Sequence, residues 1–376
     1  MLRKSTGSDA FDKQPFEFMN MTSKERVRAF FQGRCGDRVP VNYLYNPGID
    51  QRLKTHFGLA EDDDEGLLCR LGVDFRSVHP RYTGPRLHPE IPERQVDADW
   101  GLRKKWIEHE SGGYWDYCDY PLMDATEVEF DTWPMPSPDQ FDYSVVEKAC
   151  SRYPDHAIHL GGPGTADIMN TSGMLMGVEQ AMMEIIDSDS PLQRFTDRRI
   201  AVQLGVLERA LEAGHGQIDF LWIGEDLGTQ RGPIISMETY RQFIKPRHKR
   251  FVDLAKAWNI PVMIHCCGSS SWAFDEFIEM GITAVDTLQP EAKDMSPEYL
   301  KKRFGGRLHF HGMISTAGPL AYGNADEVVA NVRETLATMM PGGGYALAPT
   351  HQIQDNSPVE NVLAMYQAAR EYGRYA

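Results

Sequence analysis

Short apolar runs alternate with helix-like stretches along most of this 376-residue chain. The runs expected to form strands are 39–45, 73–78, 157–161, 218–223, 260–265, 284–288, 308–311 and 345–348. Most are separated by stretches of helical character, such as 236–258 and 325–340. Eight β-then-α units predict an α/β fold, a (β/α)₈ TIM barrel with its helices outside. An open doubly wound sheet is the alternative, although no Gly-x-Gly-x-x-Gly follows an early strand.

The expected organisation is a single barrel domain over residues 22–376, preceded by a mobile segment at 1–21. The pattern Thr22-x-x-Glu25 is a capping box that begins the first helix. Residues 82–142, rich in Pro, Trp, Tyr and acidic residues, break the alternation. Two alternating runs on either side of Gly112-Gly113 predict a β-hairpin insertion after strand 2 that partly covers one barrel end. The alternative is an ordinary surface loop with no covering role.

Charge and cysteine usage narrow the function classes. The chain has 54 acidic and 39 basic residues and a formal net charge of -15, so it lacks the basic surface that nucleic acid or an anionic membrane requires. Six cysteines without a Cys-x-x-Cys pair are typical of a reduced, cytoplasmic protein. No apolar run approaches the roughly 20 residues of a membrane span. We therefore expect a cytoplasmic protein whose ligand is a small molecule.

Nearly every expected strand ends in polar residues. In a parallel barrel the catalytic groups lie at the carboxyl ends of the strands. In chain order these ends carry Asn42 and Tyr43, Asp74 and His79, Gly161 to Gly164, Glu225 and Asp226, His265 and Cys267, Asp286 and Gln289, His309 and His311, and His351. The strand starts carry no comparable cluster, so the sequence predicts a site at this end of the barrel.

The run that ends at His265 is the most informative of these, because two thiols follow the imidazole before Gly268 breaks the run. Strand geometry places the side chains of His265 and Cys267 on the same face. A nitrogen and sulfur pair suits zinc. The alternative is a buried histidine beside two core thiols, and we expect Cys266, which is out of phase, to be a core thiol.

Three residues are predicted to form an open metal site: His265, Cys267 and His351. A catalytic zinc keeps one position open. Asp226 would be a fourth ligand or would support the site, since strand parity favours it over Glu225. His311 is a candidate general acid/base, because the ordinary pKa of histidine lies near neutrality; a structural role is equally compatible with its position.

Several segments resemble the uroporphyrinogen decarboxylase superfamily. The matching segments are 224–230, 240–246, 265–268, 310–312, 341–352 and 358–361. The likeness runs from about residue 22 to the C-terminus and is most specific after residue 220. It implies a TIM barrel with one of two activities. One is metal-free decarboxylation of uroporphyrinogen, and the other is zinc-dependent methyl transfer to or from corrinoid proteins.

The decarboxylase branch has an Arg-Gln-Ala-Gly-Arg-Tyr stretch at the first strand end, where this chain has Val41-Asn-Tyr-Leu-Tyr-Asn46. Arginines are needed there to pair with the carboxylates of an octa-acid. Asp74 matches the catalytic aspartate of that branch and His351 matches its C-terminal histidine. The missing arginines put the uroporphyrinogen substrate in doubt.

The methyltransferase branch has His-x-Cys at the fifth strand end, matched here by His265 and Cys267, and usually a third ligand, Cys, at the eighth. This chain has Pro349-Thr-His-Gln352 at that place, so the resemblance implies that His351 replaces the thiolate. A neutral imidazole in place of an anion would raise the Lewis acidity of the metal. This departure leaves open another metal, or none.

The leading hypothesis is a zinc methyltransferase that acts on a small methylated, for instance methoxylated, compound. A corrinoid would come from a carrier protein, because the chain contains no corrinoid-binding Asp-x-His-x-x-Gly segment. The roles expected are catalysis by Asp226, His311 and Asp74, and substrate binding by Tyr43, Asn42, His79, Gln289 and Glu225. The alternatives are a metal-free lyase acting on a smaller carboxylic acid and a non-catalytic tetrapyrrole-binding or docking barrel. The resemblance also implies a homodimer.

Overall fold

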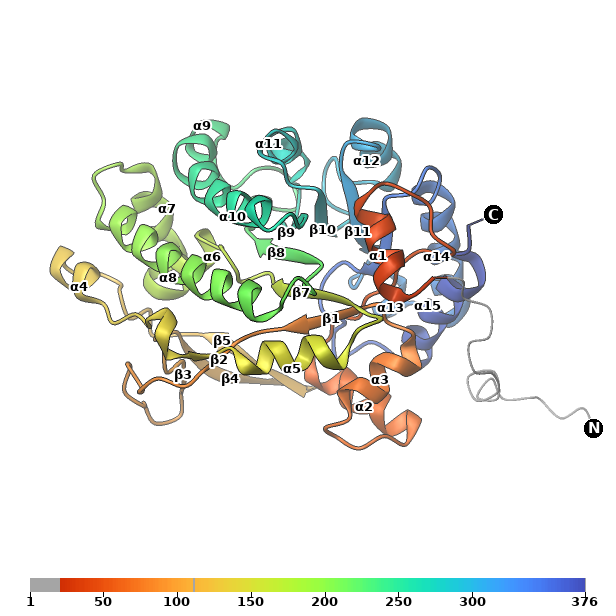
Figure 1. The fold of residues 1–376 in the computed structure, drawn as a ribbon, viewed down its shortest axis with the longest axis horizontal. Coiled ribbons are helices and arrows are strands. Elements are labelled where there is room, and N and C mark those ends of the chain that lie inside the picture. Colours follow the sequence, from red (N-terminus) through yellow and green to blue (C-terminus); the bar gives the residue numbers. More distant parts are fainter. Residues whose placement is uncertain (1–20, 111, 376) are drawn as a thin grey trace, which may run out of the picture.

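A curled parallel sheet forms the centre of the molecule (Figure 1). The computed structural model describes residues 21–110 and 112–375, so residues 1–20 of the expected mobile segment lie outside the described residues. Seven strands pair in the order β1-β7-β8-β9-β10-β11-β12, and all neighbours are parallel. Their bounds are Phe75–Val78, Ala157–Gly161, Phe220–Gly224, Val262–His265, Ala284–Leu288, His309–Ile314 and Tyr345–Pro349. The predicted α/β class and seven of the expected strand positions are confirmed.

The first expected strand, residues 39–45, is not a strand. It makes isolated bridges, one of them from Val41 to Leu347 of β12. The carbonyl of Val41 also accepts from Asp74 N at 3.0 Å, just before β1. Pro40 has no N–H, and the N–H of Val41 donates to the Asp74 carboxylate at 2.8 Å. Side chains and proline therefore interrupt the ladder, while the segment still connects the two edge strands of the sheet.

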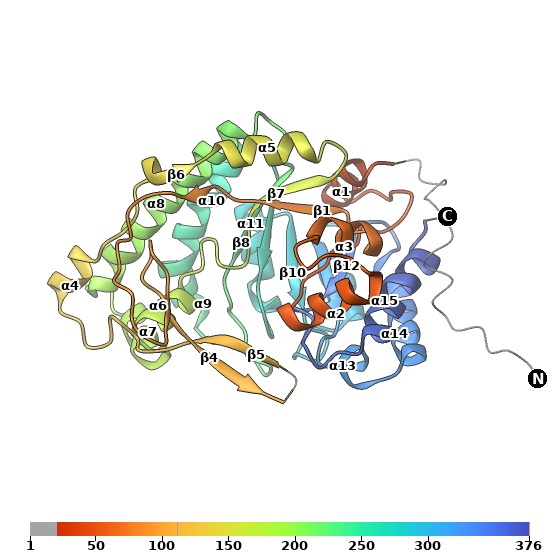
Figure 2. The same cartoon turned by 90° about the horizontal axis from the view of Figure 1, so that it is seen from below.

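The helices lie outside the sheet, as Figures 1 and 2 show. Those on the barrel are α1 Ser23–Phe31, α2 Pro47–Phe57, α3 Asp64–Leu71, α5 Ser144–Arg152, α6 Met169–Met176, α7 Val178–Ile186, α8 Pro191–Ala213, α9 Met237–Thr239, α10 Lys245–Ala257, α11 Phe274–Met280, α12 Pro297–Phe304, α13 Pro319–Tyr322, α14 Ala325–Met339 and α15 Val359–Tyr372. Short helical turns are η2 Pro138–Gln140, η3 Tyr240–Ile244 and η4 Ser271–Ala273. Among the described helices, none is both long enough and apolar enough to cross a membrane.

The long helix expected over residues 236–258 is divided. A π-helical turn, Tyr240–Ile244, separates α9 from α10, and Pro246 stands in the first turn of α10. Proline lacks the N–H that would continue an i→i−4 ladder, so a wide turn directly before it is physically consistent.

Helix α1 closes the amino-terminal end of the sheet. Its residues Val27, Phe30 and Phe31 pack in one buried cluster with inward-facing side chains of the strands, including Phe75 and Trp222. The predicted capping box is present, because the Thr22 hydroxyl accepts from Glu25 N at 3.1 Å and the Glu25 carboxylate accepts from Thr22 N at 2.8 Å. The open end of the barrel is therefore the carboxyl end of the strands.

The segment between β1 and α5 contains two small antiparallel sheets. Strand β4 (Arg103–His109) pairs with β5 (Gly112–Tyr117) and with β3 (Gln95–Val96), while β2 (Arg81–Tyr82) pairs with β6 (Phe141–Asp142). Helix α4 (Glu127–Thr132) belongs to the same segment. Figure 2 shows the β4–β5 hairpin beside the barrel on the side of α13.

Candidate metal centre

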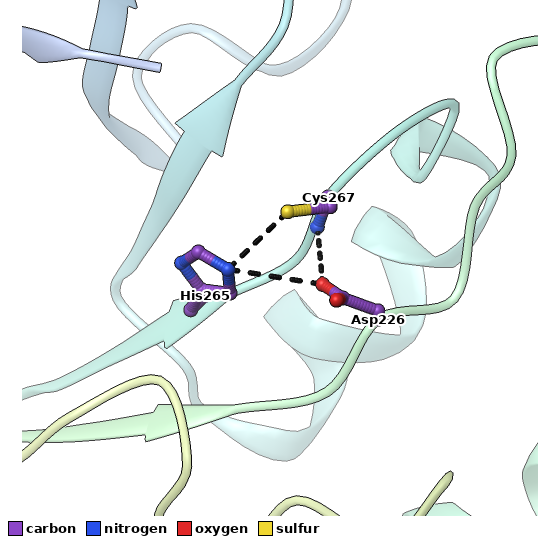
Figure 3. Close-up of side chains that lie close together, drawn as sticks. All are labelled: Asp226, His265 and Cys267. Carbon is purple, nitrogen blue, oxygen red and sulfur yellow. Dashed lines mark hydrogen bonds and ion pairs between the residues drawn. The ribbon is translucent and has the colours of Figure 1, made fainter. Parts of the chain in front are cut away.

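Three potential metal ligands meet at the carboxyl ends of β8 and β9 (Figure 3). His265 ends β9, Cys267 follows two residues later, and Asp226 lies two residues beyond the end of β8. The ligand atoms of these residues all lie within 4.8 Å of one another. His265 Nε2 is 3.3 Å from Cys267 Sγ and 3.8 Å from Asp226 Oδ1.

Strand register explains why residues from two strands meet. Gly224 pairs with His265 across the parallel ladder, so Asp226 and Cys267, each two residues further along, emerge side by side. The N–H of Cys267 then donates to Asp226 Oδ1 at 2.8 Å. This bond orients the carboxylate toward the thiol and the imidazole.

The turn after Cys267 requires glycine. Gly268 has φ +68°, and a Cβ there would lie 2.2 Å from the carbonyl oxygen of Gly228. The N–H of Gly268 donates to Gln289 Oε1 at 2.7 Å. Gln289, expected to bind substrate, is thus placed where it holds the metal-site turn.

Asp286 and Thr287 orient His265. His265 Nδ1 lies 2.7 Å from Asp286 Oδ2 and 2.6 Å from Thr287 Oγ1, and the Thr287 hydroxyl donates to the same carboxylate oxygen. Thr287 has φ +67°, a conformation that β-branched residues rarely adopt. It coincides with a register shift between β10 and β11. Because the backbone is irregular here, the side chains of the successive residues Asp286 and Thr287 both reach the imidazole of His265.

The charge on Asp286 selects the ligand atom of His265. Burial would raise the pKa of Asp286, but His311 and His265, both hydrogen-bonded to it, hold that pKa well below its ordinary value. An ionised carboxylate only accepts hydrogen bonds, so Nδ1 of His265 carries the proton. Nε2 therefore faces Cys267 and Asp226 and is the ring atom that would bind a metal ion held between them.

His311 continues this network into the barrel. Its Nδ1 lies 2.6 Å from Asp286 Oδ1, and its Nε2 lies 3.1 Å from Asn42 Nδ2. Asn42 Oδ1 accepts the backbone N–H of Tyr43, so the amide nitrogen of Asn42 is the atom that donates to His311. Both ring nitrogens of this fully buried histidine are engaged. This placement fits a positioning residue better than the proton donor expected from the sequence.

The donor set itself fits a soft or borderline cation. Burial, together with the charge of Asp226, raises the pKa of the Cys267 thiol, whereas a bound cation favours the thiolate. One imidazole nitrogen, one sulfur and one carboxylate oxygen are all zinc ligands. The residues present therefore fit zinc.

His351 lies beside this centre but outside the close group. Its ring centroid is 6.4 Å from that of His265. Two imidazoles that share a tetrahedral zinc have centroids about 5 Å apart, given Zn–N distances of about 2.1 Å. Among the described residues, the compact ligand set is thus His265, Cys267 and Asp226, and His351 would have to move closer to join it.

Two other predicted site residues face elsewhere. Asp74 precedes β1 and so lies at the opposite end of the parallel strands from His265; its fully buried carboxylate contacts Arg26 at 2.6 Å and Arg38 at 2.7 Å. Glu225 is also fully buried and accepts the backbone N–H groups at the start of α6. Burial raises the pKa of Glu225 to about 8. Neither carboxylate points to the metal centre.

Asn170 is a site residue that sequence reasoning missed. Its amide nitrogen donates to Asp226 Oδ2 at 2.9 Å and to Asp167 Oδ2 at 3.0 Å. It lies in α6, whose first residue, Met169, donates its N–H to Glu225. Nothing in the local sequence marks it, because its partner is 56 residues away.

Three residues expected to bind substrate line one cavity: Tyr43, Asn42 and His79. The cavity has a volume of about 420 Å³ and lies next to Trp222 and the Gly161–Pro163 turn. The charged groups of this cavity are paired: Arg76 with Glu65, and Asp50 and Asp64 with Lys54. The rings of Tyr43 and Tyr45 stack at 4.6 Å. Through Asn42 and His311 the cavity wall is hydrogen-bonded to the Asp286 network.

This chain matches a family model, curated relatives and a solved structure. Residues 123–372, which contain Asp226, His265 and Cys267, match the family model described as uroporphyrinogen decarboxylase (URO-D). The methylcobamide:CoM methyltransferase MtaA of Methanosarcina barkeri is 30% identical over 139 residues, 37% of this chain and 38% of that protein. The methylated-thiol–coenzyme M methyltransferase of Methanosarcina mazei is 27% identical over 139 residues, 37% of this chain and 34% of that protein. The match thus spans little more than a third of each curated relative.

A solved structure shares the fold over nearly the whole chain. A methyltransferase from Methanosarcina mazei superimposes with a TM-score of 0.63 at 20% identity, covering 94% of this chain and 99% of that one. This likeness supports the TIM-barrel-like architecture. Because the family model covers well over half of the sequence, the chain belongs to the uroporphyrinogen decarboxylase (URO-D) family.

Proposed function

We propose that this protein is a zinc-dependent methyltransferase that moves a methyl group from a small methylated compound, such as a methoxylated one, to a corrinoid on a carrier protein. The observation that carries the proposal is the close group of His265, which is buried, with the half-buried Cys267 and Asp226, in which Asp286 directs Nε2 of His265 toward the other two residues. The relatives that match are methyltransferases, one of them named for methylcobamide.

These residues would hold the zinc, with His351 next to them. When bound, zinc would act as a Lewis acid on the heteroatom that carries the methyl group. The chain's own residues contribute orientation: Asp286 and Thr287 fix the tautomer of His265, and Asn170 and the N–H of Cys267 fix the Asp226 carboxylate. The cavity beside Asn42 and Tyr43 is the proposed place for the methyl donor.

The lyase alternative has less support. A carboxylic acid substrate needs unpaired cations to bind its charge. Arg26 and Arg38 are engaged by the buried Asp74, and Arg76, in the cavity wall, is engaged by Glu65. The cavity thus offers rings and neutral polar groups in place of free arginines.

The function is tested on the purified full-length protein by two measurements. We expect close to one zinc per chain by elemental analysis, and zinc-dependent formation of methylcobalamin from cob(I)alamin and methoxylated donors, followed by its absorbance. Chelation should remove the activity and added zinc should restore it. Release of carbon dioxide from a carboxylic acid by metal-free protein, without methyl transfer, would instead establish the lyase.

The identity of the third ligand is a separate prediction. Asp226→Asn keeps an acceptor for the N–H of Cys267 but removes the negative charge beside it. We expect this change to weaken zinc binding by about 10- to 100-fold or more, as losses of ligand support do, and His351→Ala to have a clearly smaller effect. Competition with a chromophoric chelator measures both. A larger loss in His351→Ala would mean that His351 closes onto the zinc, as the sequence predicts.

A further inference from the structure

A second pocket lies beside the metal centre and is used by nothing described above. It has a volume of about 530 Å³ and is lined by the β4–β5 hairpin, the end of α13 and the segment after β12. Figure 2 shows the hairpin and α13 on the same side of the molecule. Tyr114 and Trp115 of β5 and Tyr322 of α13 contribute its rings, and His351 lines it on the side of the metal centre. We call it the hairpin pocket.

The rings of the hairpin pocket are unusually exposed for their size. Tyr322 is 77% exposed, Tyr114 47% and Trp115 44%. Large apolar groups gathered on a surface beside a functional site are typical of binding surfaces. Aromatic rings suit a ligand with flat apolar faces.

Carboxamides form most of the rest of the wall. Asn46, Gln352, Gln354 and Asn356 all line the pocket. Asn46 Nδ2 donates to Gln354 Oε1 at 3.2 Å, whereas the side chains of Gln352 and Asn356 make no hydrogen bond within the described part of the chain and are exposed. Amides both donate and accept, so they suit a ligand whose rim carries amides.

The pocket carries no free charge. Asp355, its one carboxylate, is nearly buried and accepts the N–H of Ile49 at 2.9 Å. A phosphorylated or carboxylate ligand would find no cation here, and a cationic ligand no accessible carboxylate. The wall therefore favours a large neutral ligand that is flat and fringed with amides.

We propose that the hairpin pocket binds the edge of the corrin ring of a cobamide, whose periphery carries carboxamide side chains. This inference rests on the proposed methyl transfer to a corrinoid. The pocket reaches the metal centre through His351, whose ring centroid lies 6.4 Å from that of His265. A cobamide seated against the hairpin would thus lie beside the centre at which the methyl group is released.

The probe is free methylcobalamin, whose methyl group occupies the upper cobalt position and so limits direct ligation by His351. Its binding to the zinc-loaded, full-length protein is measured by equilibrium dialysis. Tyr322→Ala and Trp115→Ala are expected to raise the Kd by about 3- to 10-fold each, the usual effect of losing a ring contact. Tyr120→Ala, which removes an exposed ring of the same insertion outside the pocket, is the matched control and should leave the Kd unchanged.

Zinc content and methyl transfer separate this inference from the proposed function. Zinc content should stay constant in all three variants, because none of these residues belongs to the ligand group. Unchanged Kd values in both Tyr322→Ala and Trp115→Ala, or no binding by the unaltered protein, would overturn the pocket assignment while leaving zinc-dependent methyl transfer intact. Weaker binding of a methoxylated donor in these variants, with unchanged methylcobalamin binding, would assign the pocket to the donor and overturn the inference.

Discussion

Replacing Cys267 with alanine is expected to weaken zinc binding by more than about 100-fold and to abolish zinc-dependent methyl transfer. Changes to residues that only support a metal ligand cost about 10- to 100-fold in affinity, and Cys267 is itself one of the three proposed ligands, whose ligand atoms lie within 4.8 Å of one another. His265 Nε2 and Asp226 would remain, and two protein ligands are fewer than the three that catalytic zinc sites keep.

Cys266 is the matched control for this experiment. It is the neighbouring residue with the same side chain, yet it is fully buried among apolar residues of the core. Cys266→Ala should retain zinc and change stability only slightly, since the lost volume is small. Zinc affinity is measured by chelator competition and activity by methylcobalamin formation. Equal zinc affinities in the two variants would rule out the proposed ligand role of Cys267.

The second large effect is expected in the stability of the folded protein. Asp74→Asn should lower the free energy of unfolding by about 3 to 5 kcal/mol, the range observed when one partner of a buried ion pair is removed. The Asp74 side chain is fully buried, and its carboxylate contacts Arg26, also fully buried, and Arg38. It also accepts from the hydroxyl of Ser23 and the N–H of Val41. The substitution would leave Arg38 without its carboxylate partner at the base of the barrel.

A surface aspartate with the same two-arginine arrangement provides the control. Asp275 contacts Arg303 at 3.1 Å and Arg307 at 3.0 Å, and all three side chains are about half exposed. Asp275→Asn should cost less than about 1 kcal/mol because water screens the charges. Urea unfolding followed by circular dichroism compares the two variants. Similar losses in both would show that burial contributes little at Asp74.

The Asp74 effect should also depend on pH. Burial alone would raise the pKa of Asp74, but Arg38 and Arg26 hold it below its ordinary value. A carboxyl group with a lowered folded-state pKa contributes stability that is present above the unfolded pKa of about 4 and is lost as pH falls through the folded value. The stability difference between the unaltered protein and Asp74→Asn should therefore shrink below about pH 4.

Local sequence patterns predicted most strands of the sheet, but they did not reveal where a run of the same apolar character fails to form a strand. Apolar runs at 157–161 and 284–288 coincide with β7 and β10, because a buried parallel strand requires continuous apolar character. The run at 39–45 has the same apolar character but does not form a continuous ladder. It makes only isolated bridges, and the N–H of Val41 donates to the Asp74 carboxylate. Its interruption depends on Asp74, a residue more than thirty positions away, which a local pattern does not contain.

The candidate site shows the same division. His265 and Cys267 could be predicted as a pair because strand alternation is local. Asp226 was expected as a fourth ligand or as a supporting residue and lies within the close group, whereas His351, expected as a ligand, lies beside it. Asp286 and Asn170 support the ligands through hydrogen bonds across 21 and 56 residues. Such contacts depend on register and helix placement, which sequence spacing does not reveal.

The amino-acid sequence by itself determined the alternation of strand and helix, the acidic character and the imidazole and thiol at the end of one strand, because each is a property of neighbouring residues. Only the tertiary structure decided which carboxylate lies beside His265 and Cys267 and which forms ion pairs with buried arginines. Asp226 and Asp74 are the same residue type near strand boundaries, but Asp226 follows strand β8 and Asp74 precedes strand β1. In parallel strands that difference places them at opposite ends of the barrel, one beside a metal centre and the other in the structural base.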